Sequence, residues 1–304
     1  MNQPDAHDAP AAPLLGAVET GGTKTVCGVG TAPDTVRIVA TIPTTTPDET
    51  LGRVVEVLRA EGVAALGVGS FGPVDLDPAS KTWGHVLNTV KPGWTDTDVA
   101  GRLGQALGVH VGFDTDVNAA ALGEGAAGAA RGVRSFVYVT VGTGIGAGVV
   151  IDGRPVRGRP HPEVGHIPIA RDPGDAFPGV CPFHGACWEG LASGPAIEAR
   201  WGARAETLPP DHPAWMIEAR AIARGLATIV LTTAPARVVL GGGVMSAPGL
   251  LALVHAALLD VLGGYVVGLD TLRAIETYVV PPALGGRAGV AGAIELAHRC
   301  LDTR

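Results

Sequence analysis

The hydrophobic positions of this chain occur in short runs, and one arrangement of them occurs twice. Residues 14–30 (LLGAVETGGTKTVCGVG) and residues 136–150 (FVYVTVGTGIGAGVV) each contain two apolar runs separated by a turn rich in Gly and Thr. Apolar runs of this length around a glycine turn predict β-hairpins. In the first turn we expect Gly21 and Gly22 to supply the positive φ that tight turns require.

Each hairpin precedes a series of alternating strand and helix patterns. In residues 49–61, apolar side chains follow helical spacing, with Arg and Glu on the other side. The further expected strands are 36–41, 65–70, 109–113, 237–240 and 275–280, and the further expected helices are 98–107, 119–130, 213–231, 250–262 and 289–300. This repetition predicts two similar α/β halves with a cleft between them.

Composition narrows the class of protein. A chain of 304 residues, 46% hydrophobic and 17% charged, is long enough for two domains or one large α/β domain. The net charge of −7 argues against nonspecific nucleic-acid binding. Residues 1–13 are polar, acidic and Pro-rich, unlike a signal peptide, and we expect a mobile lead-in. The apolar segment 250–267 contains two charged or titratable residues and a Gly pair, which predicts a buried helix and turn, no membrane span, and a soluble cytoplasmic protein.

The strongest local signal is a cluster of cysteine and histidine. Cys181, His184 and Cys187 are spaced three apart, and His166 precedes them. Zinc prefers thiolate and imidazole ligands. The Pro/Gly-rich segment 171–180 predicts a loop with few apolar anchors, which a bound metal would stabilise. The cluster therefore predicts a closed, structural Zn2+ site. The alternative is two buried thiols beside unrelated histidines, and a disulfide framework is the weaker interpretation because the other two cysteines lie in an expected strand and an expected helix.

Both glycine turns are candidates for phosphate binding. A concave set of backbone N–H groups, unobstructed by side chains, binds phosphate oxygens. Neither turn has the GxxxxGK[ST] pattern, and the second lies between two strands instead of opening a helix, unlike a dinucleotide fingerprint. One such turn alone is more typical of a structural role, whereas two on matching hairpins favour phosphate binding. The residues concerned are Gly21, Gly22, Thr23, Lys24, Thr143 and Gly144.

Asp116 stands where an apolar strand gives way to a helix, within DTDVN at residues 114–118. Strand C-termini in α/β sheets face ligand crevices, where a carboxylate can accept the proton of an attacking hydroxyl. Helix N-capping is the structural alternative, with either Asp114 or Asp116 as the cap. The sequence leaves these roles open.

Other polar and glycine positions have two interpretations each. Glu163 and Glu189 flank the cysteine and histidine cluster, and they are either sugar-binding carboxylates on a rigid loop or surface glutamates. The glycines at 241–243 either let a ligand approach a strand end or form a helix-entry turn. In LNTVKPGW (residues 87–94), Trp94 favours packing over sugar stacking.

Taken in order, these motifs resemble the ROK (repressor, open reading frame, kinase) family of sugar kinases, specifically its bacterial zinc-containing fructokinase branch. The resemblance extends from about residue 14 to residue 300. It rests on ETGGTK (19–24), FGPVD (71–75), LNTVKPGW (87–94), DTDVNAAALGE (114–124), VTVGTGIGAG (139–148), HPEVGH (161–166), CPFHGAC (181–187), EGLASGPAI (189–197) and VLGGGVM (239–245). The ordered set is highly specific, although no single segment is.

The resemblance implies an α/β fold of two ribonuclease-H-like (actin/hexokinase-type) domains flanking an interdomain cleft. The small domain would span residues 14–118 and be completed by helix 289–304, and the large domain would span 119–288 with the zinc loop. ATP, Mg2+, structural Zn2+ and a homodimer are implied as well. By motif, Asp116 is the base and the glycine turns hold phosphates. The implied sugar contacts are Asn88, Asn118, Glu163, His166 and Glu189; adenosine would lie against Gly242 and Gly243; and zinc would be held by His166, Cys181, His184 and Cys187.

Two departures from the wider family bear on the substrate. Many members of the family have Asp at the position of Glu19, whereas the fructokinase branch has Glu, as this chain does. His184 replaces one thiolate of the zinc loop found in many glucokinases of the family. The resemblance thus favours phosphorylation of the 6-hydroxyl of fructose over glucose, mannose or N-acetylmannosamine. A sugar-responsive regulator of the same family needs a helix-turn-helix before the first hairpin, where 13 polar residues stand. A chaperone-like ATPase is disfavoured by the sugar-type motifs.

Overall fold

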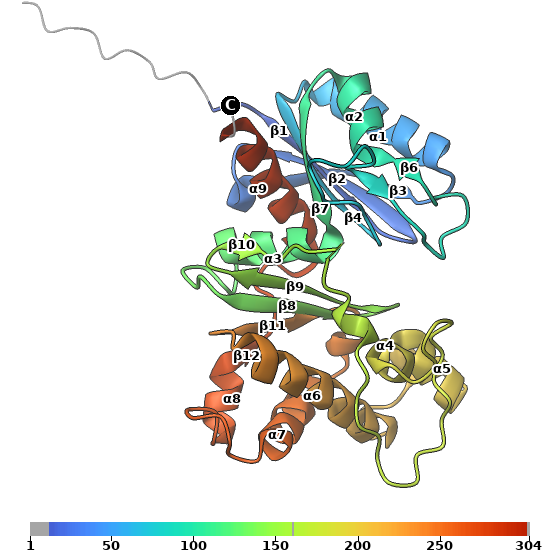
Figure 1. The fold of residues 1–304 in the computed structure, drawn as a ribbon, viewed down its shortest axis with the longest axis vertical. Helices are drawn as coiled ribbons and strands as arrows, with labels where there is room; N and C mark the ends of the chain where they lie inside the picture. Colours follow the sequence, from blue (N-terminus) through green and yellow to red (C-terminus); the bar gives the residue numbers. More distant parts are fainter. Residues whose placement is uncertain (1–11, 160, 303–304) are drawn as a thin grey trace, which may run out of the picture.

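A computed structural model of the chain describes residues 12–159 and 161–302 (Figure 1). Most of the expected lead-in of residues 1–13, and the last two residues of the expected helix 289–304, lie outside this part. Figure 1 shows two α/β units stacked along the long axis, each with its own sheet.

The N-terminal unit contains a five-stranded sheet in the order β3-β2-β1-β4-β7. β1 pairs antiparallel with β2 and parallel with β4, and β4 pairs parallel with β7. Helices α1 and α2 cover one face and α9 packs on the other, because the strands have apolar side chains on both faces. The bounds are β1 (Leu15–Thr20), β2 (Lys24–Gly30), β3 (Arg37–Pro43), α1 (Pro47–Glu61), β4 (Ala65–Ser70), α2 (Val99–Leu107), β7 (His110–Thr115) and α9 (Ala288–Asp302).

The C-terminal unit repeats this connectivity in the order β10-β9-β8-β11-β12. β8 pairs antiparallel with β9 and parallel with β11, as β1 does with β2 and β4. Helices α6 and α7 pack on one face and α3 on the other. The bounds are α3 (Asp116–Ala127), β8 (Phe136–Val141), β9 (Ile145–Ile151), β10 (Arg154–Pro155), α4 (Trp188–Ala192), α5 (Gly194–Trp201), α6 (Ala214–Thr233), β11 (Val238–Gly241), α7 (Leu250–Leu262), α8 (Leu272–Tyr278) and β12 (Val279–Val280). The expectation of two similar α/β halves is confirmed.

Short elements complete the described part of the chain. A small two-stranded sheet consists of β5 (His85–Val86) and β6 (Thr97–Asp98). The single-turn 3-10 helices are η1 (Pro33–Thr35), η2 (Val164–His166), η3 (Ala205–Thr207), η4 (Val244–Ser246) and η5 (Gly285–Arg287). Among the residues described, we find no helix with the length and apolarity needed to cross a membrane.

Helices α3 and α9 cross at the junction of the two units with almost no space between their backbones. A Cβ atom at Gly292 would lie 1.5 Å from the carbonyl oxygen of Ala119, and one at Gly123 would lie 2.3 Å from that of Ala288. No side chain fits at either position, so glycine permits the crossing. Since α3 begins at Asp116, the predicted domain boundary at residue 118 lies within its first turn.

Two details of the sequence prediction are wrong. Gly21 and Gly22 do not have positive φ, although a Cβ at Gly22 would meet no atom within 4 Å, so the turn keeps open space beside its backbone. The expected strand 275–280 is helical over most of its length, because α8 begins with a cap in which the Thr271 hydroxyl accepts from the Ala274 N–H at 3.2 Å. Within that range only Val279 and Val280 are strand, paired with β11.

Candidate active site in the interdomain cleft

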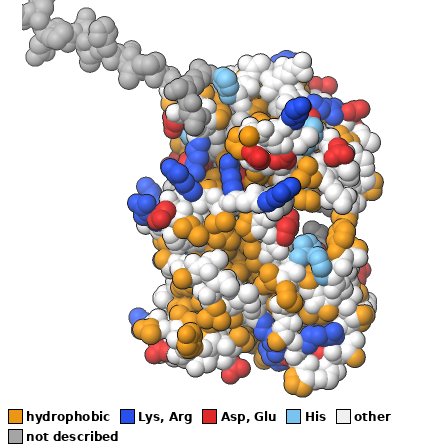
Figure 2. Space-filling view, viewed as in Figure 1, with side chains coloured by type: hydrophobic (Ala, Val, Ile, Leu, Met, Phe, Trp, Pro, Cys, Tyr) orange, Lys and Arg blue, Asp and Glu red, His pale blue; other side chains and the backbone are white. Residues whose placement is uncertain are grey.

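A cavity of about 760 Å³ lies between the two units. Both hairpin turns, the start of α3, and the loop that follows β10 contribute to its wall. Figure 2 shows histidine and acidic side chains gathered at the hollow between the units. The sequence-predicted site residues that line it are Gly21, Gly22, Thr23, Lys24, Asn88, Asp116, Thr143, Gly144, Glu163, His166, His184 and Glu189. Segments far apart in the sequence thus meet in one cavity, as the twin hairpins predicted.

Asp116 is the first residue of α3, and it does not cap the helix. The cap is Thr115, whose hydroxyl accepts a hydrogen bond from the Asn118 N–H at 3.0 Å. The Asp116 carboxylate accepts a local hydrogen bond from the Val117 N–H at 2.8 Å and lines the cavity. Because the cap role belongs to another side chain, the carboxylate is available for a ligand.

The electrostatic surroundings raise the pKa of Asp116 to about 7. Burial is the largest cause, the negative charge of Glu19 is the next one that raises it, and Glu163 adds a smaller effect. Burial also raises the pKa of Glu19, while Lys24 lowers it. A carboxyl with a pKa near 7 in a cleft is suited to proton transfer at neutral pH.

Asn118 does not face the cavity. Its amide donates to Asp114 at 2.7 Å, and the other oxygen of this fully buried carboxylate accepts from Arg157 at 2.7 Å. Asp114 is therefore a structural residue that fixes the start of α3. The sequence-based proposal of a sugar contact at Asn118 is at odds with this geometry, because two residues along a helix correspond to about 200° of rotation.

The second glycine turn is held by Glu189. One oxygen of this carboxylate accepts from the Ile145 N–H at 2.9 Å, and a Cβ at Gly144 would lie 2.7 Å from the same oxygen. The turn is also hydrogen-bonded from the Gly194 N–H to the Gly142 carbonyl at 2.7 Å. Glu189 thus holds the turn through a hydrogen bond to one of its oxygens, and its side chain also lines the cavity.

Gly242 and Gly243 follow β11 and lie outside the described lining of this cavity. Gly242 has φ of 101°, and a Cβ there would lie 2.3 Å from the carbonyl oxygen of Val141. Only glycine fits at position 242, because the ends of β11 and β8 pack closely there. The Gly243 nitrogen lies beside the second turn, 3.8 Å from the position of a Cβ at Gly142.

His166, Cys181, His184 and Cys187 form a compact group whose ligand atoms all lie within 4.8 Å of one another. His166 Nδ1 is 3.7 Å from the sulfur of Cys181 and 3.6 Å from that of Cys187, and His184 Nδ1 is 3.7 Å from Cys181. Tetrahedral zinc, with bonds of about 2.3 Å to sulfur and 2.0 Å to nitrogen, separates such atoms by about 3.6 Å. The residues therefore fit zinc. Both cysteines and Cys27 are free thiols, contrary to a disulfide framework.

Trp94 packs inside the N-terminal unit, as expected. It is fully buried, its ring meets Phe71 edge-on with centroids 5.1 Å apart, and its indole N–H donates to the Thr45 carbonyl at 2.8 Å. Asn88, in the same sequence motif, is exposed at the cavity wall. The motif thus supplies one packing residue and one candidate ligand contact.

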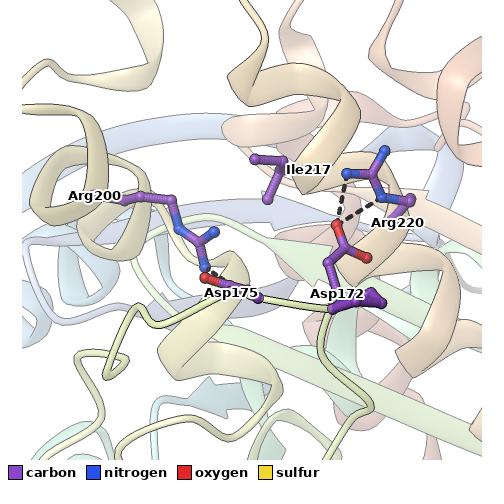
Figure 3. A pocket seen from close by; sticks show the side chains of 7 residues that line it. Asp172, Asp175, Arg200, Ile217 and Arg220 are labelled. Carbon is purple, nitrogen blue, oxygen red and sulfur yellow. Dashed lines mark hydrogen bonds and ion pairs between the residues drawn. The ribbon is translucent and has the colours of Figure 1, made fainter.

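A second hollow of about 540 Å³ lies beside the loop between β10 and α4, which carries the cysteine and histidine group. Figure 3 shows the charged side chains of this hollow joined in pairs. Asp172 accepts from Arg220 at 2.6 and 2.8 Å and from Arg224 at 2.5 Å. Asp175 accepts from Arg200 at 3.1 Å. These pairs fasten the loop to α5 and α6, and the lowered pKa of Asp172, caused first by its hydrogen bond from Arg220, agrees with that role.

The sequence interpretation missed His161. Its side chain is almost fully buried and lines the main cavity, where it contacts both units. The motif HPEVGH contained the signal, since a second histidine stands two residues before Glu163.

Comparison with known proteins gives consistent results. A model of the ROK family matches residues 15–300. The chain is similar to a putative fructokinase of Bacillus subtilis (strain 168), with 44% identity over 95% of this chain and 97% of that protein. It is similar to a fructokinase of Zymomonas mobilis, with 44% identity over 93% and 96%. Among solved structures, a ROK family glucokinase from Streptomyces griseus in complex with glucose and AMPPNP has a TM-score of 0.74, 27% identity, and coverage of 94% of this chain and 99% of that one.

Proposed function

The chain belongs to the ROK family, and from this premise we propose that it is an ATP-dependent fructokinase that phosphorylates the primary 6-hydroxyl of fructose. One observation carries the proposal: a carboxylate with a pKa of about 7, Asp116, shares a cavity with two glycine turns and a set of polar side chains. Relatives named fructokinase match nearly the whole length of this chain.

Asp116 is the catalytic base of this proposal. It accepts the proton of the 6-hydroxyl as that oxygen attacks the γ-phosphorus of ATP, and ADP leaves with the electrons of the broken P–O bond. The position supports the role, because the carboxylate faces the cavity and Thr115 performs the capping.

The two glycine turns bind the phosphates of ATP. Both turns line the same cavity, and Lys24 adds a positive charge at the first turn. The Streptomyces griseus relative, solved with AMPPNP, supports ATP as the phosphoryl donor. Mg2+ would neutralise phosphate charge when bound, and Glu19 is a carboxylate of the kind it prefers. Gly242 and Gly243 remain the proposed neighbours of adenosine. The use of ATP fits the cytoplasmic location expected from the sequence.

Sugar hydroxyls are bound by residues from both units. Asn88 lies on the N-terminal side, and Glu163, His166 and Glu189 lie on the C-terminal side. His166 turns Nδ1 toward the two sulfurs, which leaves Nε2 for the sugar. Asn118 is dropped from this set, because its amide is engaged with Asp114.

The zinc-type group is a structural Zn2+ site in this proposal. With four protein ligands the ion has no open position for chemistry. Its effect is to hold the loop that carries Glu163 and His166. A homodimer, expected from the family resemblance, is also proposed, and light scattering should give twice the chain mass of 30.7 kDa.

The test is a coupled ATP-consumption assay with fructose, glucose, mannose and N-acetylmannosamine. We expect the largest kcat/KM with fructose. The relative solved with glucose makes glucose the second candidate, and a preference for glucose would overturn the fructose assignment while keeping the kinase. Absence of sugar-dependent ATP consumption with all four would overturn the kinase itself.

A further inference from the structure

His161 contacts both walls of the cleft with one imidazole. Its side chain is 6% exposed and lines the cavity. Nε2 accepts a hydrogen bond from the Val74 N–H at 3.2 Å, and Nδ1 lies 3.5 Å from Glu163 Oε1. Val74 belongs to the N-terminal unit, after β4, whereas His161 and Glu163 belong to the loop of the C-terminal unit. The ring therefore joins a sugar-facing carboxylate to the opposite domain.

The donor at Val74 determines the tautomer of the ring. A backbone N–H can only donate, so Nε2 must be the unprotonated nitrogen, and a neutral imidazole then carries its proton on Nδ1. Both groups within reach of Nδ1, the Pro162 carbonyl and the Glu163 carboxylate, are acceptors at 3.5 Å. Every contact of the ring is thus complementary to the Nδ1–H form.

The partner backbone is rigid and leads to another proposed sugar contact. Val74 is fully buried and forms a β-bridge with Val86. The Leu87 N–H donates to the Pro73 carbonyl at 2.7 Å, immediately before Asn88. The His161 contact therefore fixes the segment after β5 that carries Asn88 relative to the loop that carries Glu163.

We infer that His161 is a positioning residue that couples the approach of the two domains to the orientation of Glu163 toward the sugar. The inference rests on the proposed function, because it takes Glu163 as a sugar contact. Separation of the domains would break the bond to Val74 and release the ring from its fixed orientation. The second oxygen of Glu163 would then lose its fixed direction.

Substitutions at His161 separate its contact with Val74, made through Nε2, from its contact with Glu163, made through Nδ1. His161→Ala should raise the KM for fructose about tenfold, as expected for the loss of a buried hydrogen-bonded contact, while the KM for ATP changes less than about twofold. His161→Asn keeps a donor near the Nδ1 position, and His161→Gln keeps an acceptor near the Nε2 position. Each should restore part of the fructose affinity. The exposed His110→Ala is the matched control and should resemble the wild type.

A double-mutant cycle tests whether His161 acts through Glu163. In a Glu163→Ala background, His161→Ala should change kcat/KM for fructose by less than about twofold, since the oriented group is already absent. A full tenfold further loss there would overturn the inference, as would parallel increases in the KM values for fructose and ATP.

Long-range ¹⁵N–¹H NMR of the imidazoles tests the geometry without a substrate. The signal that disappears in His161→Ala should have the Nδ1–H pattern in the sugar-free protein, and an Nε2–H pattern would overturn the inference. If the wild type consumes no ATP with any of the four sugars, the proposed function fails. If the wild type is active but the effects of His161→Ala and Glu163→Ala are additive, only the role of His161 is rejected.

Discussion

Asp116 is held in two opposing environments. Burial and the neighbouring Glu19 penalise its charge, whereas the start of α3 provides the Val117 N–H that stabilises it. The balance leaves the pKa at about 7, where the acid and its conjugate base interconvert at physiological pH. An unperturbed aspartate, with a pKa of about 4, would remain ionised but would accept a proton weakly.

The pH dependence follows from this value. The base must be ionised, so kcat/KM should fall about tenfold per pH unit below an inflection near 7. Glu19→Gln removes the charge that raises the pKa of Asp116, so the inflection should move to lower pH even if kcat also falls. Initial rates from pH 5 to pH 9 would measure both profiles. An inflection that stays in place in Glu19→Gln would contradict this electrostatic account.

Asp116→Asn separates catalysis from binding. Turnover should fall by about 10³-fold or more, because an amide cannot accept the proton, while calorimetry should still detect fructose. The folded protein penalises the ionised carboxylate, so the wild type loses stability as pH rises from about 4 toward 7. At pH 8 the variant should therefore unfold at a higher temperature than the wild type. Asp211→Asn, at an exposed position, is the control, and near-normal turnover in Asp116→Asn would refute the base.

At the scale of elements, the loop between β10 and α4 has almost no regular structure and is fastened at two places. One is the group of two cysteines and two histidines, and the other is the pair of aspartates that meet arginines of α5 and α6. A long loop with few apolar anchors otherwise keeps conformational entropy that binding would have to remove. Both attachments therefore preorganise this wall of the cavity.

Metal content is the direct test of the first fastening. Protein purified without added zinc should contain about one equivalent per chain if all four ligands bind one ion. Cys181→Ser should lose the metal and raise the KM for fructose more than the KM for ATP. Cys300→Ser, in α9, should keep it. Full metal content in Cys181→Ser would exclude this ligand set.

The second fastening is tested at Asp172. Asp172→Asn should lower the free energy of unfolding by about 1 kcal/mol, because partly exposed ion pairs contribute modestly, and should raise the KM for fructose. Its lowered pKa means that the contribution is present at neutral pH and is lost as pH falls through that pKa. Glu206→Gln removes an exposed pair with Arg204 and should change neither quantity. Urea unfolding and initial rates would measure both effects.

Sequence periodicity predicted the elements whose patterns are unambiguous. The hairpins and the helix 250–262 have the expected bounds or nearly so, because apolar runs and glycine turns specify them locally. The short apolar run before residue 280 could not be assigned from hydrophobic periodicity alone. The N-cap at Thr271 stabilises a helix there. At the site, the sequence placed Asp116 at the junction of a strand and a helix, where the structure has it. It could not give the direction of Asn118, since hydrogen bonding at the start of α3 and helix rotation determine it.

At the scale of the whole molecule, two units with equivalent sheets share one crossing of helices. α3 carries Asp116 at its first residue, and α9 packs on the N-terminal sheet, so the crossing connects Asp116 to the opposite domain. Closure of such a cleft would exclude water from the phosphoryl group and limit ATP hydrolysis. The distance between the two glycine turns therefore depends on how α3 and α9 pack.

Gly292→Ala tests that dependence. Its Cβ would lie 1.5 Å from the Ala119 carbonyl oxygen, so the helices must separate. We expect a loss of about 3 kcal/mol or more in the free energy of unfolding, together with a lower kcat, because a displaced α3 moves Asp116. Gly52→Ala is the matched control: it is also a helical glycine, but a Cβ there meets no atom within 4 Å, and it should be neutral or stabilising. If both variants unfolded alike and turned over fructose alike, the crossing could not be what aligns the two domains.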